Sequence, residues 1–462
     1  MLFNSVVFLF AFLPVTYLVF WGLTSRAARY KWLTLTGYVF YGYWDPRFCL
    51  LMAFSTLVSY SAGLGFLRYT DPRRRRLCLV VPIVADLLLL GFFKYFNFTL
   101  DTAHTLVRWF GADVSLPHLN IILPVGISFY TFHTITYIVD SYRGVITPTR
   151  NFFEFSTYVS LFSQLVAGPI VRFRQIESDL DHLDTASRMR WLVPGVQFFV
   201  VGLVEKVLVA DSLAAFVDPA LAEYGSLSTL GAWLAMLGYT FQLYFDFSGY
   251  SSMAVGLGFL FGLRIPQNFN SPYKALDPSD FWTRWHISLS SVLRDYLYIP
   301  LGGNRHGVYK TYRNLMITML LGGLWHGAAW TFVVWGAYHG ALLCAYRVFQ
   351  ERWNRLPAAA RQLAMFLFVL IGWVFFRSTS FTMAASLLQT MFVPTGGSLV
   401  PQPALALVAI GIAAWWAMVG PNAFELPLRD RPRVRVAWAV GFAASLAIIL
   451  GTRSSPFLYF QF

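Results

Sequence analysis

The sequence predicts an all-α polytopic membrane protein, a helical bundle of about ten to twelve transmembrane helices. Hydrophobic residues make up 57% of the 462 residues and charged residues only 12%, whereas a soluble domain averages about 25% charged residues. The mean hydropathy is +0.56. Apolar runs alternate with short basic segments, and a run of about 20 apolar residues crosses a bilayer as a helix. No polar insert is long enough to fold alone, so we expect residues 1–462 to form one domain.

The net charge of +13 does not indicate a nucleic-acid partner. The basic residues lie in the segments between apolar runs, as the positive-inside rule predicts, and no nucleic-acid recognition module is present. Cys49, Cys78 and Cys344 are scattered without metal-type spacing. We interpret them as packing residues.

The first apolar run, residues 2–23, lacks the basic start and the cleavage site of a signal peptide, so we expect a retained first helix. Arg26, Arg29 and Lys31 follow it and place that loop in the cytoplasm and the N-terminus in the periplasm.

The next crossings are expected over residues 32–44, 50–67, 77–93 and 121–139, with an outer loop at 97–120. Four arginines at 73–76 either orient the protein or bind anionic lipid headgroups. Asp86 lies within an apolar run, where it belongs either to a polar relay or to a buried structural contact. Residues 153–172 are interrupted by Ala167-Gly168-Pro169 between basic flanks, which predicts a re-entrant element.

Further crossings are expected over residues 191–210, 230–247, 363–376, 403–419 and 436–450, with outer loops at 211–223 and 378–401. Residues 264–313 are basic but rich in aromatic rings, which predicts helices lying at the membrane interface. Residues 315–347 are too long for one crossing. Two crossings, or one long tilted helix broken near Gly322-Gly323, would both fit.

His326 lies within this last run, in the sequence Gly322-Gly323-Leu324-Trp325-His326-Gly327. An ionisable side chain at membrane depth is costly, so its default interpretation is a functional site. A zinc site needs three or four converging ligands, and His339, thirteen residues on, would lie on roughly the opposite face of a continuous helix. We therefore expect no metal.

No hydrolase elbow, P-loop or dinucleotide-binding glycine pattern is present. What remains is histidine as a general base, since burial keeps an imidazole neutral and able to take a proton from a hydroxyl. Gly302 and Gly303, beside Arg305, would let a backbone approach a phosphate.

Four motifs resemble the signature of the membrane-bound O-acyltransferases, in particular the bacterial branch that acetylates alginate and related polymers. They are Trp282–Ser290, Leu293–Ile299, Leu301–Arg305 and Gly322–Gly327. The resemblance extends over nearly the whole chain through Leu123–Phe132, Ala167–Pro169, Gln242–Ser251, Asn268–Tyr273 and Ser455–Phe462. One segment departs from the alginate branch, because Ser163 and Gln164 stand where that branch has proline and histidine.

The resemblance implies that His326 is the principal catalytic histidine and His286 the second, with the catalytic signature within residues 240–345. It also implies a bundle with re-entrant and interfacial helices and a central tunnel, which the donor enters from the cytoplasm and the acceptor from outside.

We therefore expect an O-acetyltransferase of the bacterial inner membrane, which acetylates an exported polysaccharide such as alginate or cellulose. Acetyl-CoA is the expected donor substrate, and no permanently bound cofactor is expected. Arg264, Lys274, Arg284, Arg294 and Arg305 either contact the phosphates of the donor or only orient the protein. The candidate substrate-binding residues are Trp325, Asp246, Arg284, Arg294, Asp295, Asn304 and Arg305. Asp246 and Asp295 would hold a histidine tautomer or line the substrate path.

The expected partners are a periplasmic acetyl-transferring protein, the polysaccharide synthase and export machinery, and membrane lipids. Two alternatives stay open from the sequence. One is D-alanyl transfer to a cell-wall polymer from a carrier protein, and the other is a non-enzymatic export conduit lined by the polar residues. The paired broken helices of many transporters are not evident in the sequence.

Overall fold

The computed structural model describes residues 1–111, 118–166, 168–183, 188–426, 432–451 and 458. The chain divides into two compact units. Unit 1 comprises Met1–Leu192 with Leu257–Pro266, and unit 2 comprises Val193–Gly256 with Gln267–Phe462. That the whole chain is one domain stays a prediction.

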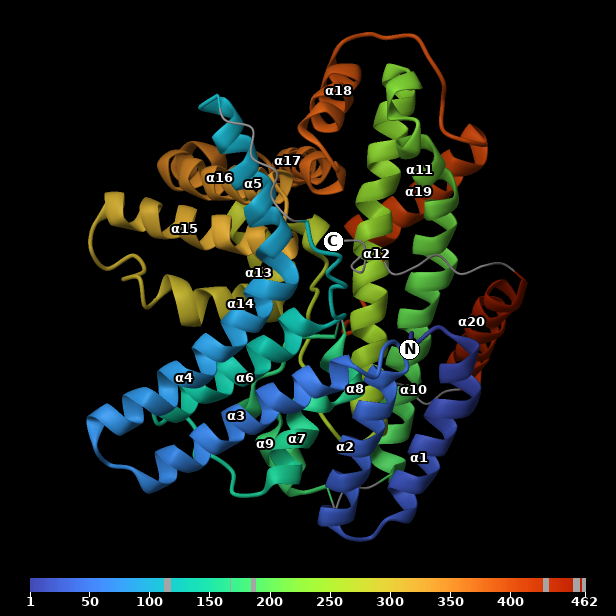
Figure 1. Cartoon of the computed structure of the whole chain (residues 1–462). Coiled ribbons are helices and arrows are strands. Elements are labelled where there is room, and N and C mark those ends of the chain that lie inside the picture. Colours follow the sequence, from blue (N-terminus) through green and yellow to red (C-terminus); the bar gives the residue numbers. More distant parts are fainter. Residues whose placement is uncertain (112–117, 167, 184–187, 427–431, 452–457, 459–462) are drawn as a thin grey trace. The chain divides into compact units, whose positions relative to one another are not determined.

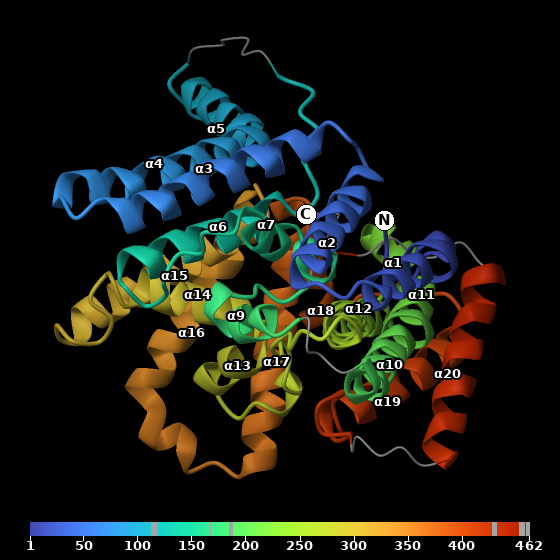
Figure 2. The ribbon, with the colours of Figure 1, turned by 90° about the horizontal axis from the view of Figure 1, so that it is seen from below.

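Unit 1 is built from helices, and α3, α4 and α6 pack against one another within it (Figure 2). A π-helical turn, Phe8–Phe12, leads into α1, and another, Gly91–Tyr95, joins α4 to α5. The bounds are α1 Leu13–Gly22, α2 Arg26–Gly42, α3 Phe48–Arg68, α4 Pro72–Leu90, α5 Phe96–Trp109, α6 Ile127–Tyr142, α7 Phe152–Ser160, α8 Phe162–Leu165 and α9 Phe173–Asp181.

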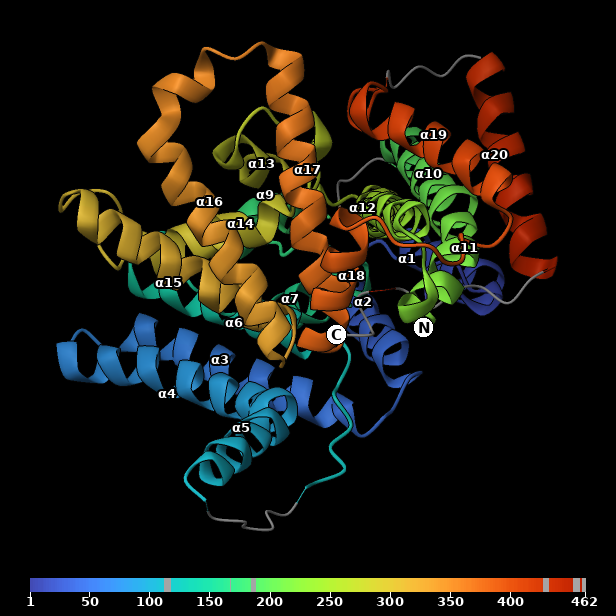
Figure 3. The same ribbon diagram turned by 90° about the horizontal axis from the view of Figure 1, so that it is seen from above.

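Unit 2 contains most of α10 and α12 and all the later helices, and α16 and α17 run side by side within it (Figure 3). Their bounds are α10 Arg188–Val204, α11 Asp211–Ala222, α12 Thr229–Leu260, α13 Pro278–Arg284, α14 Ile287–Leu293, α15 Val308–His326, α16 Trp330–Asn354, α17 Ala358–Arg377, α18 Phe381–Phe392, α19 Pro403–Met418 and α20 Pro432–Gly451. Two π-helical segments, Glu205–Ala210 and Arg294–Tyr298, follow α10 and α14.

The prediction of an all-α polytopic membrane protein is confirmed. In the described part of the chain, six helical stretches are long and apolar enough to cross a bilayer, and three shorter apolar helices accompany them. The longest are Pro72–Trp109 and Arg188–Ala222, with 38 and 35 residues. Which face of the membrane each loop occupies stays a prediction.

Three predicted outer loops are wrong in part, because each contains a helix. Residues 96–109 form α5, since no glycine or proline lies between Gly91 and Gly111 to end the helix. Residues Asp211–Ala222 of the predicted acidic loop form α11, which ends before Glu223. In residues 378–401, the Ser380 hydroxyl accepts from the Met383 N–H and starts α18.

The break in residues 315–347 lies after His326, four residues beyond the predicted position near Gly322-Gly323. Residues 327–329 are non-helical, with extended backbone at Gly327 and Ala329, and separate α15 from α16, which pack against each other (Figure 1). A Cβ added to Gly323 would lie 2.2 Å from the Phe332 carbonyl oxygen, and one added to Gly336 2.3 Å from that of Met319. These two glycines therefore allow the backbones of α15 and α16 to touch.

The predicted re-entrant segment is indeed irregular. Two short helices, α7 and α8, are followed by a non-helical stretch up to Arg172 whose described residues are buried. Its relation to a membrane stays a prediction. Ala167, Arg429 and the terminal motif at 459–462 lie outside the described residues.

Asp86 is buried and accepts hydrogen bonds from the Ser55 and Thr134 hydroxyls, each at 2.6 Å. This geometry fits the structural alternative for that carboxyl.

Candidate active site

His326 is the last residue of α15, and aromatic rings enclose it. It is 4% exposed. Its ring centroid lies 5.1 Å from those of Trp325 and Trp335 and 5.3 Å from that of Phe376. His339 belongs to α16, so the two histidines lie on separate helices, in line with the expected break in residues 315–347. Among the described residues, no group of three or more His, Cys, Asp or Glu side chains could hold a metal ion.

His286 lies between α13 and α14 and is completely buried, with its ring centroid 6.3 Å from that of His326. Trp325 lies beside both histidines, with its ring centroid 5.9 Å from that of His286. The φ of His286 is +44°, a left-handed backbone conformation that costs about 1–3 kcal/mol in a residue other than glycine. The fold therefore brings the two predicted catalytic histidines together, and holds one of them in a strained turn.

The strained turn is tied to the segment before α13. The Ile287 N–H donates to the Asn268 carbonyl oxygen at 2.9 Å, and the Asn270 N–H donates to the Arg284 carbonyl oxygen at 2.9 Å. The Asn268 side-chain oxygen accepts from the Ser288 N–H at 3.1 Å, and the Nδ1 of His286 lies 3.2 Å from the same oxygen. Burial lowers the pKa of His286 to about 3, so its ring is neutral at physiological pH.

A small cavity lies on the other side of Asn268, with room for about one water molecule. Its wall includes the Glu205 carboxylate, which accepts from the Ser248 and Ser252 hydroxyls at 3.0 and 3.4 Å. Ser251 also lines it and accepts a hydrogen bond from the Asn268 amide at 3.2 Å. A polar chain of α12 hydroxyls thus reaches the segment that supports His286.

Asp246 does not hold a histidine. Its carboxylate lies 2.5 Å from the Lys206 ammonium and accepts the Leu458 N–H at 2.9 Å. Lys206 also pairs with Asp211 at 2.7 Å. Asp246 and Lys206 are both about 2% exposed in their side chains, so the pair is buried between the π-helical segment and α12.

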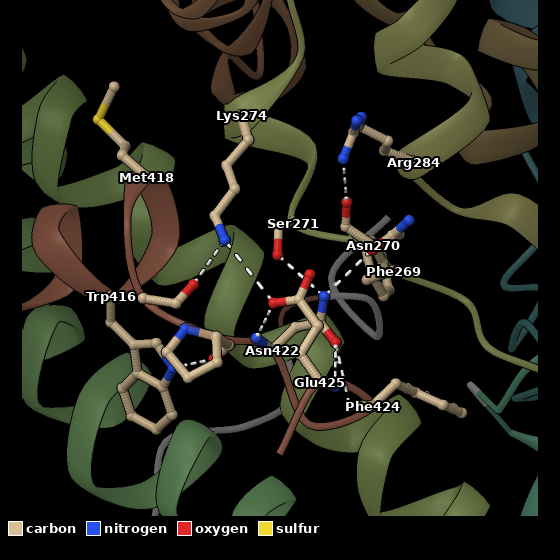
Figure 4. Close-up of polar contacts among 12 residues, drawn as sticks. Phe269, Asn270, Ser271, Lys274, Arg284, Trp416, Met418, Asn422, Phe424 and Glu425 are labelled. Carbon is tan, nitrogen blue, oxygen red and sulfur yellow. Dashed lines mark hydrogen bonds and ion pairs between the residues drawn. The ribbon is translucent and has the colours of Figure 1, made fainter. Parts of the chain in front are cut away.

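Three basic candidates of unit 2 are engaged in ion pairs, namely Lys274, Arg284 and Arg294. Figure 4 shows Lys274 with its partners and the contact of Arg284 with Asn270. Arg284 donates to Asp280 at 2.6 Å and to the Asn270 carbonyl oxygen at 3.2 Å. The Lys274 ammonium donates to the Gly420 carbonyl oxygen at 2.7 Å and lies 3.7 Å from Glu425.

Arg294 and Asp295 pair with each other at 2.7 Å, and the Arg294 side chain is 64% exposed. Asn304 and Arg305 lie in an exposed turn, where Gly302 and Gly303 both have positive φ. Arg264 belongs to unit 1, where it pairs with Asp179. Among the candidate substrate-binding residues described above, only Trp325 has a ring that lies against His286 and His326.

Three buried residues of this region had no predicted role. Asn268 stood in a family motif without an assignment, and no local pattern shows that it reaches His286. Glu205 and Lys206 did leave a signal, because two adjacent charges interrupt an apolar run.

Comparison with known proteins gives one consistent result. Residues 123–388 match the model of the MBOAT, membrane-bound O-acyltransferase family. The probable alginate O-acetylase AlgI of Azotobacter vinelandii is 40% identical over the full length of both chains. The peptidoglycan O-acetyltransferase of Helicobacter pylori is 38% identical over 86% of this chain and 81% of its own.

A third relative, the teichoic acid D-alanyltransferase of Bacillus subtilis, is 30% identical over 52% of this chain and 62% of its own. The matched region contains His286 and His326 together with the helices α13 to α16. The chain belongs to the membrane-bound O-acyltransferase family.

Proposed function

We propose that this enzyme transfers acetyl from cytoplasmic acetyl-CoA to a hydroxyl of an exported polysaccharide, or of a protein that passes the group on. The observation that carries the proposal is the pair of buried histidines, His286 and His326, with ring centroids 6.3 Å apart. Two buried imidazoles in an aromatic setting, with the ring of His286 neutral, suit proton transfer from a hydroxyl.

In the proposed reaction, His326 takes the proton of the acceptor hydroxyl while its oxygen attacks the thioester carbonyl carbon. The tetrahedral intermediate collapses, the carbon–sulfur bond breaks, and the CoA thiolate takes the proton back from His326. His286 orients the acceptor. A polysaccharide offers several hydroxyls, so one can donate to His286 while its neighbour reacts.

Stabilisation of the oxyanion is assigned to the start of α16. The N–H groups at the start of a helix carry partial positive charge, which favours an anion there. α16 begins four residues after His326, directly behind the non-helical segment 327–329. The Thr331 hydroxyl, in its first turn, is buried and has no hydrogen-bond partner within the described part of the chain. It supplies an O–H donor close to these N–H groups.

The donor would dock with its nucleotide at the basic segment 264–313, and the exposed Arg305 is the candidate phosphate contact. We propose an inner-membrane location with the N-terminus in the periplasm, in line with the basic loops. A periplasmic acetyl-transferring protein and the synthase and export machinery of the polysaccharide would be the partners.

The relatives favour O-acetylation over D-alanyl transfer. The alginate O-acetylase relative covers all of this chain, whereas the D-alanyltransferase relative covers 52% of it. Membership of an acyltransferase family argues against a non-enzymatic conduit. Because Ser163 and Gln164 differ from the alginate pattern, cellulose and peptidoglycan glycans stand beside alginate as candidate acceptors.

The test uses the purified full chain in lipid vesicles with radiolabelled acetyl-CoA. Deacetylated uronate, glucose and amino-sugar oligosaccharides serve as acceptors, and D-alanyl carrier protein replaces acetyl-CoA in a parallel reaction. We expect CoA release together with a labelled acetyl ester. His326→Ala should abolish turnover, and His286→Ala should reduce it strongly.

The control is His182→Ala, because His182 is exposed in unit 1. The proposed roles fail if either active-site variant, folded as judged by elution and thermal unfolding, turns over acetyl-CoA like the control. Consumption of the D-alanyl carrier in place of acetyl-CoA would overturn the choice of donor.

A further inference from the structure

Asn268 links α12 to the strained turn at His286 through every polar atom of its side chain. The side chain is 1% exposed. Its amide nitrogen donates to the Ser251 hydroxyl on α12 at 3.2 Å. Its oxygen accepts hydrogen bonds from the Ser288 N–H at 3.1 Å and from the Ser288 hydroxyl at 2.8 Å. The same oxygen lies 3.2 Å from the Nδ1 of His286.

This network permits one orientation of the amide. A backbone N–H can only donate, so the atom of Asn268 that faces the Ser288 N–H must be the oxygen. An amide oxygen can only accept, so a hydrogen bond across the 3.2 Å to Asn268 requires the hydrogen on the Nδ1 of His286. The Ser288 hydroxyl also lies 3.5 Å from Nδ1, but it donates to the Asn268 oxygen at the shorter distance of 2.8 Å. In a neutral ring the other nitrogen, Nε2, then has a lone pair and no hydrogen.

The Nε2 of His286 is buried and has no hydrogen-bond partner among the described residues. An unpaired buried acceptor costs about 1–3 kcal/mol, and such atoms in a native structure commonly have a functional cause. The rings nearest to His286 are those of Phe247 and Trp325, at 4.7 and 5.9 Å, and His326 lies beside them.

We infer that Asn268 is a positioning residue that fixes His286 in the Nδ1–H tautomer, so that Nε2 faces the reaction as a hydrogen-bond acceptor. This inference rests on the proposed function of His286. In this tautomer Nε2 can hold a hydroxyl of the acceptor, but it cannot donate to an oxyanion. Oxyanion stabilisation therefore falls to other donors, such as those at the start of α16.

The first measurement uses the unaltered protein. Histidine labelled with ¹⁵N distinguishes a protonated ring nitrogen from one with a lone pair, and the spectrum of His286→Gln identifies the signals of His286 by subtraction. We expect a protonated Nδ1 and an unprotonated Nε2. A protonated Nε2 with a bare Nδ1 would overturn the inference, whatever the variants do.

The second measurement compares Asn268→Leu, which has a similar volume but no acceptor, with Asn268→Asp, which keeps an acceptor toward Nδ1. We expect kcat for acetyl-CoA turnover to fall about 10- to 100-fold in Asn268→Leu with an unchanged KM, because the hydrogen bond that selects the tautomer is lost. Asn268→Asp should restore most of kcat and keep the Nδ1–H spectrum.

The matched control is Asn270→Asp. Asn270 lies two residues away, and its side-chain oxygen accepts from Asn422 and not from a histidine (Figure 4). A folded Asn268→Leu variant with the kcat and the His286 spectrum of this control would overturn the inference. If instead His286→Gln keeps full turnover, the catalytic role of His286 fails, while the spectrum of the unaltered protein still tests the tautomer.

Discussion

Replacing Gly323 by alanine should damage both stability and activity, while the same change at its neighbour Gly322 should not. Gly323 lies where α15 touches α16, and an added Cβ would sit 2.2 Å from the Phe332 carbonyl oxygen and 3.1 Å from the Gly336 backbone. These are backbone atoms, so no side-chain rotation relieves the clash. At Gly322, the added Cβ would meet only the end of the Leu293 side chain, at 3.1 Å.

The two free energies can be compared directly. Glycine to alanine inside a helix gains about 0.8–1.0 kcal/mol from helix propensity alone. Overpacking against a rigid neighbour costs about 1–3 kcal/mol and occasionally more. Gly322→Ala should therefore be neutral or stabilising by up to about 1 kcal/mol, whereas Gly323→Ala should be destabilising by up to about 2 kcal/mol net. His326 lies only three residues further along α15, and a shift of about 1 Å at a reacting group lowers the rate about 100-fold.

The assay is thermal unfolding of both purified variants in the same detergent, followed by acetyl-CoA turnover at a temperature where both are folded. We expect Gly323→Ala to unfold at a lower temperature and to lose most of its kcat. Equal unfolding temperatures and equal kcat for the two variants would refute the close helix contact and its link to His326.

Three further outcomes are expected. Lys206→Met should lower stability by about 3–5 kcal/mol, because Asp246 is left buried without its partner, and adding Asp246→Asn should recover much of the loss in thermal unfolding. Arg305→Ala should raise the KM for acetyl-CoA about 3- to 10-fold at unchanged kcat, because a phosphate contact is equally present in the ground and transition states. The control is Arg355→Ala, since Arg355 is also exposed, and equal KM values for the two variants would contradict the phosphate contact. The pKa of His286 is lowered from its ordinary 6.5 to about 3. Below pH 6.5 the unfolded chain takes up a proton at His286 while the folded protein does not, so the free energy of unfolding falls, by about 2 kcal/mol at pH 5. Unfolding of the unaltered protein at pH 8 and pH 5 should show this loss, and an equal loss in His286→Gln would contradict it.

The parts of the fold that follow from local sequence were predictable. Long apolar runs gave most of the long helices, because a run of about 20 apolar residues has few other stable states in a bilayer. Shorter helices outside the predicted crossings were missed, as with α5, α11 and α18. Their ends depend on local hydrogen bonds, such as the Ser380 cap of α18, which hydropathy does not measure.

The candidate site was predictable only where a single residue carried the signal. His326 stands out because a lone imidazole in an apolar run is costly, whatever surrounds it. Asp246 carries the same signal, yet its charge is neutralised by Lys206, which lies 40 positions earlier in the chain. A costly buried charge indicates that a partner exists, but the fold decides whether that partner is a substrate or another side chain.

The contacts of Asn268 could not be predicted from the sequence, because they depend on the register between two segments. The backbone of Asn268 and Asn270 pairs with residues 284–287, and that register brings the amide oxygen to the Nδ1 of His286. A shift of one residue would carry the side chain away from the ring, and the tautomer would no longer be selected. The chemistry of the site is therefore set partly by a loop pairing with no periodic pattern, and a substitution that shifts the register of that pairing should change catalysis without touching either histidine.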